Sequence, residues 1–555
     1  MKQTMALTLV LLLLFSLLAG CGQSPASSSA SASGANQPVE STEAPAASGE
    51  AAAAVPAGVT AAEGNNRVFY EIFVGSFSDS DGDGIGDLRG IINRMDYLND
   101  GDDSSGKSLG IEGIWLTPIF KSGSYHKYDV NDYYEVDPSF GTMDDLKELV
   151  ALCHSRNVKL ILDLPINHTG SNHPWFNSFV VAHRKADTED PYYNYYCFCG
   201  KDEIAPAGRS FAALTGTDER YECNFDGGMP ELNYDSEDVR QAVLDVAKFY
   251  LDLGVDGFRF DAAKYIYFGD NSASAAFWDW YLQELRAVKP DVYTVAEVWD
   301  GDGVTQLYYP ATNCFDFSTA MAEGLIASTA QKGDVNRYVG YVQAYLDGVQ
   351  ALRADATIVP FLANHDTDRA AGFLPAMNGY AQMAANLLIL GPGSPFLYYG
   401  EELGMRGSRG GANTDANRRL AMVWGDGDTV RDPQGTTYPA DNRSEGSAVE
   451  QMGSPDSLYS YYKRLILLRK ANPEIACGDY RALVLSDTKV GGFTASRNGK
   501  SCLVLHNTTG SAATLELGAL GLAAFTEISG FAGRGTATLD GGVLTLEAQT
   551  SVVLR

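Results

Sequence analysis

The stretch DGFRFDAAK, residues 256–264, places an arginine and an aspartate two positions apart among glycine and phenylalanine. Side chains of a β-strand alternate between its two faces, so Arg259 and Asp261 would share one face and Phe258 and Phe260 the other. A cation beside a carboxyl group lowers its pKa and keeps it ionised, as a nucleophile requires. Each residue alone could equally belong to a buried ion pair, so further acidic groups are needed to indicate catalysis.

Other polar residues follow apolar segments in the same way. They are Asp163, Asn167, His168, Glu297, His365 and Asp366. Three carboxylates, at Asp261, Glu297 and Asp366, would favour a catalytic over a structural role if the chain brought them together. Whether they meet depends on the elements that carry them.

Those elements alternate along the chain. Short runs rich in Val, Ile, Phe and Tyr are separated by helical patterns such as MDDLKELVALCHSRN and DVRQAVLDVAKFYLDLG. Eight strands are predicted: VFYEIFVGSF, IEGIWLTPIF, VKLILDLPIN, VDGFRFDAA, VYTVAEVW, CFDFS, IVPFLANH and SPFLYYGEEL. Strands that alternate with helices favour a parallel (β/α)₈ barrel, in which the carboxyl ends of all strands meet at one mouth. The polar residues above lie at those ends.

Two further domains are predicted around this barrel, which we place at residues 65–475. The connection after the third strand, about 168–235, is long and rich in aromatic residues and cysteine, which favours an inserted domain. Its PYYNYYCF stretch could stack on a ligand or form the core of that domain. From residue 476 to 555, alternating strands with glycine turns predict a C-terminal all-β sandwich domain.

The first 64 residues differ from the rest. Met1 and Lys2 precede an apolar run, LTLVLLLLFSLLA, that is too short for a comfortable membrane span and ends in LLAGC. This pattern resembles the bacterial lipoprotein signal, which implies a signal peptide at 1–20 and a lipid on Cys21; an ordinary secretory signal is the alternative. Residues 21–64, rich in Ala, Ser and Pro, predict a disordered tether. We therefore expect a folded body outside the cytoplasm, lipid-anchored to the membrane.

The net charge of the chain is −29. This charge disfavours nucleic acid and anionic membrane as partners, so we expect contact with the membrane only through the anchor, and a monomer. Seven cysteines remain beyond Cys21. In an exported protein some could pair, such as Cys477 with Cys502 or Cys223 with Cys197 or Cys199.

Four motifs, taken in order, resemble those of the α-amylase family, glycoside hydrolase family 13. They are DLPINH (163–168), GFRFDAAKY (257–265), AEVWD (296–300) and FLANHD (361–366). A fifth, MPELN (229–233), resembles a family stretch that precedes the fourth strand, in a form between the amylase type and the oligo-1,6-glucosidase and neopullulanase types. The resemblance covers roughly residues 67–473 and implies an α-glucan or maltooligosaccharide substrate.

The resemblance also implies roles for individual residues. Asp261 would be the nucleophile and Glu297 the general acid and base, while Asp366 would hold the distorted sugar. The remaining implied contacts with the substrate are Tyr128, His168, Arg259, Lys264, His365 and Arg369. A retaining mechanism needs an ionised nucleophile and a protonated acid about 5–5.5 Å apart. Buried structural histidines are the alternative for His168 and His365, and Lys127 stands where the family commonly has glycine.

Departures from the family pattern concern specificity. Ala262 follows the nucleophile where α-1,6-acting glucosidases tend to have valine, which favours α-1,4 linkages. Lys264 is present as in endo-acting amylases, but Tyr265 replaces the usual histidine. An exo-acting α-glucosidase or a cyclomaltodextrinase- or neopullulanase-like enzyme therefore remains an alternative. A non-catalytic carbohydrate-binding protein would lack the carboxylates that are all present here.

The segment DSDGDGIGDL, residues 79–88, has the spacing of a calcium loop. Its candidate ligands are Asp79, Asp81, Asp83, the Ile85 carbonyl and Asp87. Gly90 stands at the twelfth position, where an EF-hand needs glutamate, but the segment resembles a Ca²⁺ loop that follows the first strand in several members of the family. A solvated acidic turn is the alternative. The resemblance also implies a second calcium site at Asn167.

Overall fold

The computed structural model describes residues 59, 64–441 and 443–555. The expected signal peptide at 1–20, the lipid-bearing Cys21 and nearly all of the 21–64 tether lie outside the described residues. Among the described helices, none is both long enough and apolar enough to cross a membrane.

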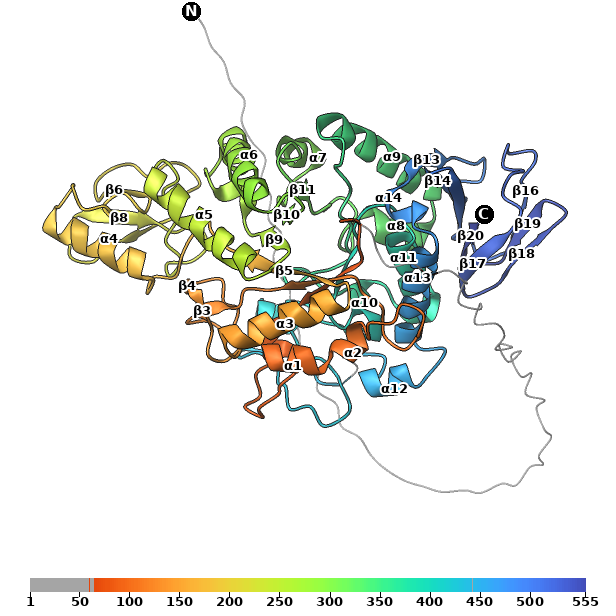
Figure 1. Ribbon diagram of the computed structural model, residues 1–555, viewed down its shortest axis with the longest axis horizontal. Coiled ribbons are helices and arrows are strands. Elements are labelled where there is room, and N and C mark those ends of the chain that lie inside the picture. Colours follow the sequence, from red (N-terminus) through yellow and green to blue (C-terminus); the bar gives the residue numbers. More distant parts are fainter. Residues whose placement is uncertain (1–58, 60–63, 442) are drawn as a thin grey trace, which may run out of the picture. The chain divides into compact units, whose positions relative to one another are not determined.

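A parallel barrel forms the body of the chain (Figure 1). Its strands are β1 (Phe69–Ile72), β2 (Gly113–Leu116), β5 (Lys159–Leu164), β9 (Gly257–Phe260), β10 (Tyr293–Ala296), β11 (Asn313–Cys314) and β12 (Phe396–Tyr398). They form one seven-stranded sheet in the order β11-β10-β9-β5-β2-β1-β12. Residues 359–361 bridge Phe315 on one side and Phe396 on the other, both in parallel, and so take the place between β11 and β12. All eight predicted strands therefore occupy barrel positions, and the predicted fold class is confirmed.

The phenylalanines of the fourth barrel strand point outward, as predicted. Phe260 packs against Trp278 of helix α6 (Asn271–Val288), with ring centroids 4.4 Å apart. The inward face carries Arg259, which lies over the Trp115 ring at 5.2 Å. Below it the barrel interior is filled by aromatic side chains such as Phe69 and Phe396, stacked at 4.7 Å. The barrel interior is thus a packed core that ends in charged groups at its mouth.

Helices surround the barrel because each buries one apolar stripe. The longer ones are α3 (Met143–Ser155), α5 (Glu237–Asp252), α6, α8 (Leu325–Lys332), α9 (Val335–Leu352), α11 (Tyr380–Ile389) and α13 (Leu458–Ala471). The shorter ones are α1 (Leu88–Asn93), α2 (Met95–Leu98), α7 (Asp302–Thr305), α10 (Ala370–Phe373), α12 (Ala448–Met452) and α14 (Glu474–Cys477). In α5 the buried positions Val239, Val243, Val246 and Tyr250 recur every three or four residues. Thr142 begins α3 with a capping box that includes Asp145, which satisfies backbone amides at that end.

Two inserted segments extend from the barrel at its mouth. A hairpin, β3 (Phe120–Ser122) with β4 (Val130–Val136), follows β2. After β5 comes α4 (Pro174–Lys185) and a small antiparallel sheet of β6 (Phe198–Gly200), β8 (Glu219–Glu222) and β7 (Phe211–Ala213). Within the PYYNYYCF stretch, Tyr196 is fully buried and Tyr193 stacks on His183 at 4.0 Å. The aromatic residues of this stretch therefore form the core of the second inserted segment.

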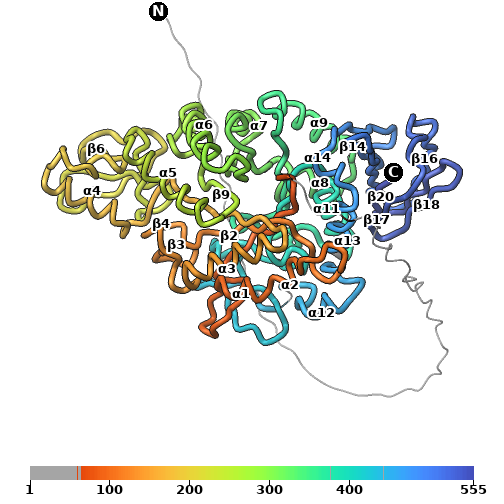
Figure 2. The backbone as a smooth tube through the Cα atoms, in the orientation of Figure 1, coloured from red at the N-terminus to blue at the C-terminus, as the bar shows by residue number. Residues whose placement is uncertain are grey.

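The C-terminal strands form two antiparallel sheets, traced in blue in Figure 2. One contains β13 (Asp479–Leu483), β14 (Val490–Arg497), β15 (Lys500–Asn507), β20 (Thr550–Leu554) and β17 (Ile528–Gly533). The other contains β16 (Ala513–Glu516), β19 (Val543–Leu546) and β18 (Ala537–Asp540). Leu503, Leu505, Leu544 and Leu546 pack between them, as in a sandwich. Cys197, Cys199, Cys223 and Cys502 are free thiols, so none of the considered disulfides forms.

Candidate active site

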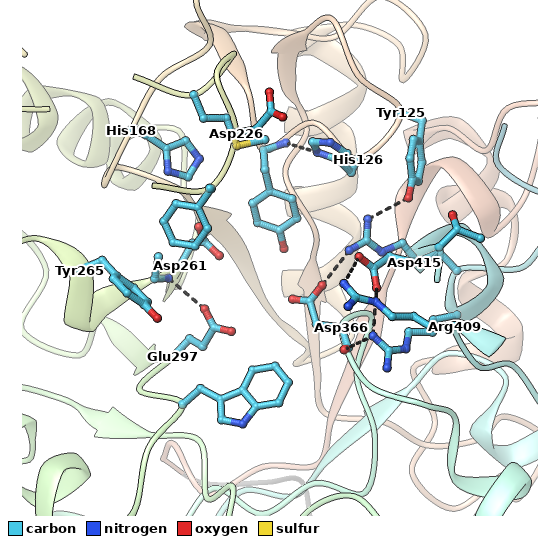
Figure 3. Close-up of a pocket in the computed structure, with 18 of the residues that line it drawn as sticks. Tyr125, His126, His168, Asp226, Asp261, Tyr265, Glu297, Asp366, Arg409 and Asp415 are labelled. Carbon is cyan, nitrogen blue, oxygen red and sulfur yellow. Dashed lines mark hydrogen bonds and ion pairs between the residues drawn. The ribbon is translucent and has the colours of Figure 1, made fainter. Parts of the chain in front are cut away.

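A cavity of about 870 Å³ lies at the mouth of the barrel (Figure 3). Its lining includes six of the residues predicted from the sequence: Tyr128, His168, Asp261, Lys264, Glu297 and Asp366. Arg259 and His365 have no exposed surface and lie behind this lining. Asp261 and Glu297 directly follow strands β9 and β10, while Asp366 follows the bridging residues 359–361. The strand ends therefore bring all three carboxylates to one cavity.

Asp261 and Glu297 are held side by side by the strand register. Phe260 pairs with Ala296 in the β9–β10 ladder, and the two carboxylates are the next residue on each strand. The backbone N–H of Ala262 donates to Glu297 Oε2 at 2.9 Å, an interaction drawn in Figure 3. Ala262 adopts a left-handed conformation with φ of 48°, which is strained for a residue other than glycine. That conformation directs its amide across to the neighbouring strand.

Arg259 is the central cation of the site. Its Nη1 donates to Asp261 Oδ1 at 2.7 Å and to Asp163 Oδ1 at 2.8 Å. Its Nη2 lies 3.1 Å from Glu297 Oε2 but makes no hydrogen bond there. Burial raises the pKa of Asp261 and Glu297, and Arg259 opposes the rise at both. Asp261 therefore has the stronger interaction with the shared cation.

Asp366 is surrounded by a second set of charges. Its Oδ2 lies 3.0 Å from His365 Nε2, and its Oδ1 accepts from Arg419 Nη2 at 2.7 Å. On its far side His365 Nδ1 lies 2.6 Å from Glu71 Oε1. Burial lowers the pKa of His365, but Asp366 and Glu71 outweigh it and raise that pKa to about 10. Burial would raise the pKa of Asp366, yet His365 and Arg419 hold it well below its usual value.

Tyr128 connects these two charge sets. Its hydroxyl donates to Asp163 Oδ2 at 2.8 Å and lies 2.6 Å from His365 Nε2, on which its ring is stacked. The preceding Lys127 has φ of 65°, which accounts for glycine being expected at this position. Lys127 adopts this conformation with its Nζ held 2.9 Å from Asp137 Oδ2. The glycine-to-lysine departure is therefore accommodated locally.

His168 and Lys264 reach the cavity from other elements. Burial lowers the pKa of His168 to about 4, so its ring is neutral at physiological pH. Its Nε2 is buried and has no hydrogen-bond partner in the described part of the chain, which leaves it available to a ligand hydroxyl. Lys264 Nζ donates to the Trp299 carbonyl at 2.8 Å and lies 3.1 Å from Asp300 Oδ2. These contacts fix the ammonium at the rim of the cavity.

The structure does not bring Arg369 to the cavity. Its guanidinium donates to the carbonyls of Arg418 and Tyr399 at 2.8 and 2.7 Å and lies over the Tyr398 ring. It is 1% exposed and does not belong to the lining. The physical reason is that α10 begins immediately after it and turns the side chain toward β12. The arginine that reaches the Asp366 carboxylate is Arg419.

Sequence reasoning missed Arg419, Glu71 and the part played by Asp163. Glu71 carried a usable signal, because a lone acid in the apolar strand FYEI has to find a buried partner. Asp163 pairs with Arg259 in the β5–β9 register, so its contact was implicit in the strand pattern. Arg419 follows β12 in an irregular segment and carried no local signal.

The candidate calcium loop brings three carboxylates together. Ligand atoms of Asp79, Asp81 and Asp87 all lie within 4.8 Å of one another. Asp83 is outside this group, and its Oδ1 accepts from the Ile85 N–H at 2.7 Å. Burial would raise the pKa of Asp79, but hydrogen bonds from the Thr429 hydroxyl and backbone amides hold it below its usual value. The three ionisable oxygens are the hard ligands that Ca²⁺ prefers, so the donor set fits this ion.

Asn167, the candidate ligand of a second calcium site, is hydrogen-bonded to another side chain. Its side-chain amide donates to the Glu231 carboxylate, whose other oxygen accepts from the Asn224 N–H at 3.1 Å. Burial raises the pKa of Glu231 to about 8. Within the described residues, Asn167 therefore belongs to a hydrogen-bonded pair that joins β5 to the inserted segment.

Comparison with known proteins places this geometry in context. The family model for the catalytic domain of alpha amylase matches residues 71–478. Alpha-amylase 3 of Dictyoglomus thermophilum is 34% identical over 444 residues, which cover 80% of this chain and 84% of that protein. Oligo-1,6-glucosidase of Bacillus cereus is 30% identical, covering 81% and 91% respectively. The solved structure of Eubacterium rectale Amy13B superposes with a TM-score of 0.80 at 33% identity, covering 88% of this chain and 95% of that one.

Proposed function

The chain belongs to the α-amylase family of glycoside hydrolases, and from this premise we propose that it hydrolyses α-1,4-glucosidic bonds in starch, glycogen or maltooligosaccharides with retention of configuration. The observation that carries the proposal is the placement of Asp261 and Glu297. They follow register-paired residues of neighbouring strands and share one arginine. A retaining glycosidase needs two carboxyl groups about 5–5.5 Å apart, one ionised and one protonated.

The two groups are assigned by their unequal contacts with Arg259. Asp261 accepts a charge-assisted hydrogen bond, which favours its ionised form and the role of nucleophile. Glu297 lacks that bond to Arg259 and is buried, which raises its pKa and favours a proton on it. Asp261 attacks the anomeric carbon while Glu297 gives its proton to the leaving glycosidic oxygen. Water then gives a proton to Glu297 and its hydroxide to the anomeric carbon, which releases Asp261.

The other groups position the sugar. Asp366, kept ionised by His365 and Arg419, accepts hydrogen bonds from hydroxyls of the sugar whose bond is cleaved. The unpartnered Nε2 of His168 accepts or donates one more hydrogen bond, and the ring of Tyr128 supplies an apolar face. Because these contacts strengthen as the ring distorts, they favour the transition state.

An exo-acting α-glucosidase, or an enzyme of the cyclomaltodextrinase or neopullulanase kind, is the second candidate. The name of the Bacillus cereus relative, oligo-1,6-glucosidase, and the intermediate form of MPELN support it. Ala262 beside the nucleophile and Lys264 at the rim favour α-1,4 cleavage in the interior of a chain. A chromatogram of products from starch, maltotriose, pullulan and cyclodextrin separates the candidates, since only an endo-acting amylase yields mixed oligosaccharides from starch at early times.

The stereochemistry tests the mechanism itself. Double displacement requires that reducing ends appear first as the α-anomer, which NMR detects in the first minutes of hydrolysis. Initial release of the β-anomer would contradict the roles given to Asp261 and Glu297. Binding of starch without new reducing ends would indicate a carbohydrate-binding protein instead.

We also propose that the acidic loop holds Ca²⁺ through Asp79, Asp81 and Asp87. The three clustered carboxylates and the calcium-loop spacing support this proposal. When bound, the ion would neutralise their mutual repulsion and stabilise the connection after β1. Anchoring through a lipid on Cys21 is proposed from LLAGC alone.

A further inference from the structure

The active-site cavity extends in two directions from its carboxylates. Toward one end it is lined by Phe225 and Met229 of the inserted segment and by Tyr265. Toward the other it is lined by Arg409 and Asn413 of the loop that follows β12. Figure 3 shows Tyr265 and Arg409 on opposite sides of the space around Glu297 and Asp366. These two directions are all that an unbranched chain uses, because it extends only forward and backward from the cleaved bond.

A third arm begins at Asp366, the only one of the three carboxylates that lines it. It is a separate hollow of about 480 Å³ that shares Trp299, Asp366 and Arg418 with the main cavity. From there it continues between loops that follow different strands, past Glu323 and Phe373. Its volume lies within the roughly 300–1,000 Å³ of small-ligand sites. An unbranched substrate that fills both ends of the main cavity leaves this arm without an occupant.

The wall of the arm is fixed and suits a neutral sugar. Trp299 is 41% exposed and held by stacking on Phe317, with centroids 4.8 Å apart and planes at 13°. Arg418 Nε donates to Asp368 Oδ1 at 2.8 Å, and its Nη1 donates to Asp415 Oδ1 at 2.9 Å. An aromatic face beside fixed charged groups offers stacking for a sugar ring and hydrogen bonds for its hydroxyls.

We propose that this third arm receives an α-1,6-linked branch attached to a glucose unit at or beside the cleaved bond, so that α-1,4 bonds at or beside a branch point are cleaved. The inference rests on the proposed α-1,4 hydrolysis at Asp261 and Glu297. A branch point is the place where an α-glucan extends in three directions, and the three arms meet at Asp366, which holds the sugar at the cleaved bond. The two ends of the main cavity take the α-1,4-linked main chain.

The test fills the arm from two different loops. Gly372 and Ala322 line the arm but not the main cavity, and a Cβ added at Gly372 meets nothing within 4 Å. Gly372→Trp and Ala322→Trp are compared with Gly340→Trp in α9, where an added Cβ also meets no atom within 4 Å and which lines neither cavity. The probes are maltoheptaose and a maltooligosaccharide of similar size that carries one α-1,6-linked maltosyl branch.

For the unaltered enzyme we expect kcat/KM on the two probes to agree within about tenfold. In both arm variants kcat/KM on the branched probe should fall by about tenfold or more, while that on maltoheptaose and that of the control stay unchanged. An equal loss on both probes would make the arm part of the unbranched path, and no loss on either would leave it without a ligand; both overturn the inference. If the unaltered enzyme failed to cleave maltoheptaose, the proposed function itself would be wrong.

Discussion

Two groups of buried or half-buried carboxyl side chains lie just beyond the barrel strands, and they have opposite surroundings. At the mouth, Asp261 and Asp366 contact the cations Arg259 and Arg419. After β12, Glu401 and Glu402 lie in a short 3₁₀ turn (Glu401–Leu403) and form no ion pair with any described residue. They accept hydrogen bonds from tyrosine hydroxyls instead, from Tyr462 to Glu401 at 3.0 Å and from Tyr70 to Glu402 at 2.8 Å.

The difference shows that burial alone does not decide the charge of a carboxyl group. Burial raises the pKa of Glu402, and it raises that of Glu401 to about 8 despite the hydroxyl contacts. Asp366 is held well below its usual pKa because a histidinium and a guanidinium accompany it. Hydroxyls can stabilise a neutral acid in the interior, whereas a permanently charged acid needs a cation. At the mouth, Arg259 and Arg419 are such cations, beside Asp261 and Asp366 respectively.

The largest effect on activity should come from removing a carboxylate at the mouth, compared with removing one of the carboxyl groups after β12. Asp261→Asn should lower kcat by more than about 10³-fold with the fold intact, because an amide cannot form the covalent intermediate. Glu402→Gln should change kcat by less than about threefold, because Glu402 does not line the cavity and an amide keeps the acceptor oxygen that the Tyr70 hydroxyl uses. Both are measured on maltoheptaose, with circular dichroism as a check on folding. A folded Asp261→Asn protein that kept more than a few per cent of activity would contradict the assignment.

The next prediction removes the arginine beside Asp366, so that this mouth carboxylate loses one of its cations. Arg419→Met should raise the pKa of Asp366 and lower kcat/KM by roughly 10- to 100-fold, the size expected for one lost charge-assisted hydrogen bond. The acid limb of the pH profile should move to higher pH. Arg443→Met is the matched control, since Arg443 makes a comparable pair with Asp432 at 2.8 Å and does not line the cavity. A control that lost as much activity would reduce the effect of Arg419 to general stability.

The two regions should differ in the pH range over which they change the stability of the folded protein. Glu401 ionises near 4.5 in the unfolded chain and near 8 in the folded one, so stability falls as pH rises between these values. Glu401→Gln should match the parent in melting temperature below pH 4.5 and exceed it increasingly up to pH 8. His365 titrates near 6.5 unfolded and near 10 folded, so the stability it contributes is complete below 6.5 and lost by 10.

His365→Gln should therefore melt below the parent at pH 6 and approach it toward pH 10. Each window corresponds to at most about 1.4 kcal/mol per pH unit for one group. Melting curves at constant ionic strength from pH 4 to 10 measure both. If the two variants diverged from the parent over the same window, the contrast between the regions would be wrong.

The smallest effect, on the melting temperature, is expected from the acidic loop after β1. Without a cation, the loop of Asp79, Asp81 and Asp87 should repel itself, so Ca²⁺ should raise the melting temperature by about 2–5 °C. Chelator should reverse this shift and leave the initial rate little changed at a temperature well below melting. Asp81→Ala should abolish the response, because Asp81 is one of the three clustered carboxylates. Identical melting curves in chelator and in millimolar calcium would leave the loop an ordinary acidic turn.

Much of the fold could be read from the sequence because parallel barrel strands are buried on both faces. Their apolar runs are nearly continuous, as in the burial of every residue of β9 and β10, and they stand out between amphipathic helices. The family expectation is likewise confirmed, by the match of the family model to residues 71–478. The motif residues sit at strand ends whose positions follow from local alternation. The positions of Asp261 and Glu297 relative to each other needed only the strand order.

What the sequence could not predict depends on long-range packing. Arg369 stands three residues after Asp366, yet α10 carries it away, while Arg419, 53 positions beyond Asp366, reaches it at 2.7 Å. The β3–β4 hairpin, which presents Tyr128, has no pattern that sets its register against the barrel. The third arm arises where four loops meet and has no counterpart in any single segment.

The shared register of β9 and β10 has a consequence for how such an enzyme changes over evolutionary time. The spacing of Asp261 and Glu297 is inherited from the hydrogen-bonded ladder in which Phe260 faces Ala296, and neighbouring strands lie about 4.8 Å apart. Insertions and deletions in the surrounding loops leave that ladder untouched, whereas a one-residue slip would turn one carboxylate to the opposite face. Substrate choice can therefore change through substitutions in the loops, while the anomeric configuration of the released sugar stays constant.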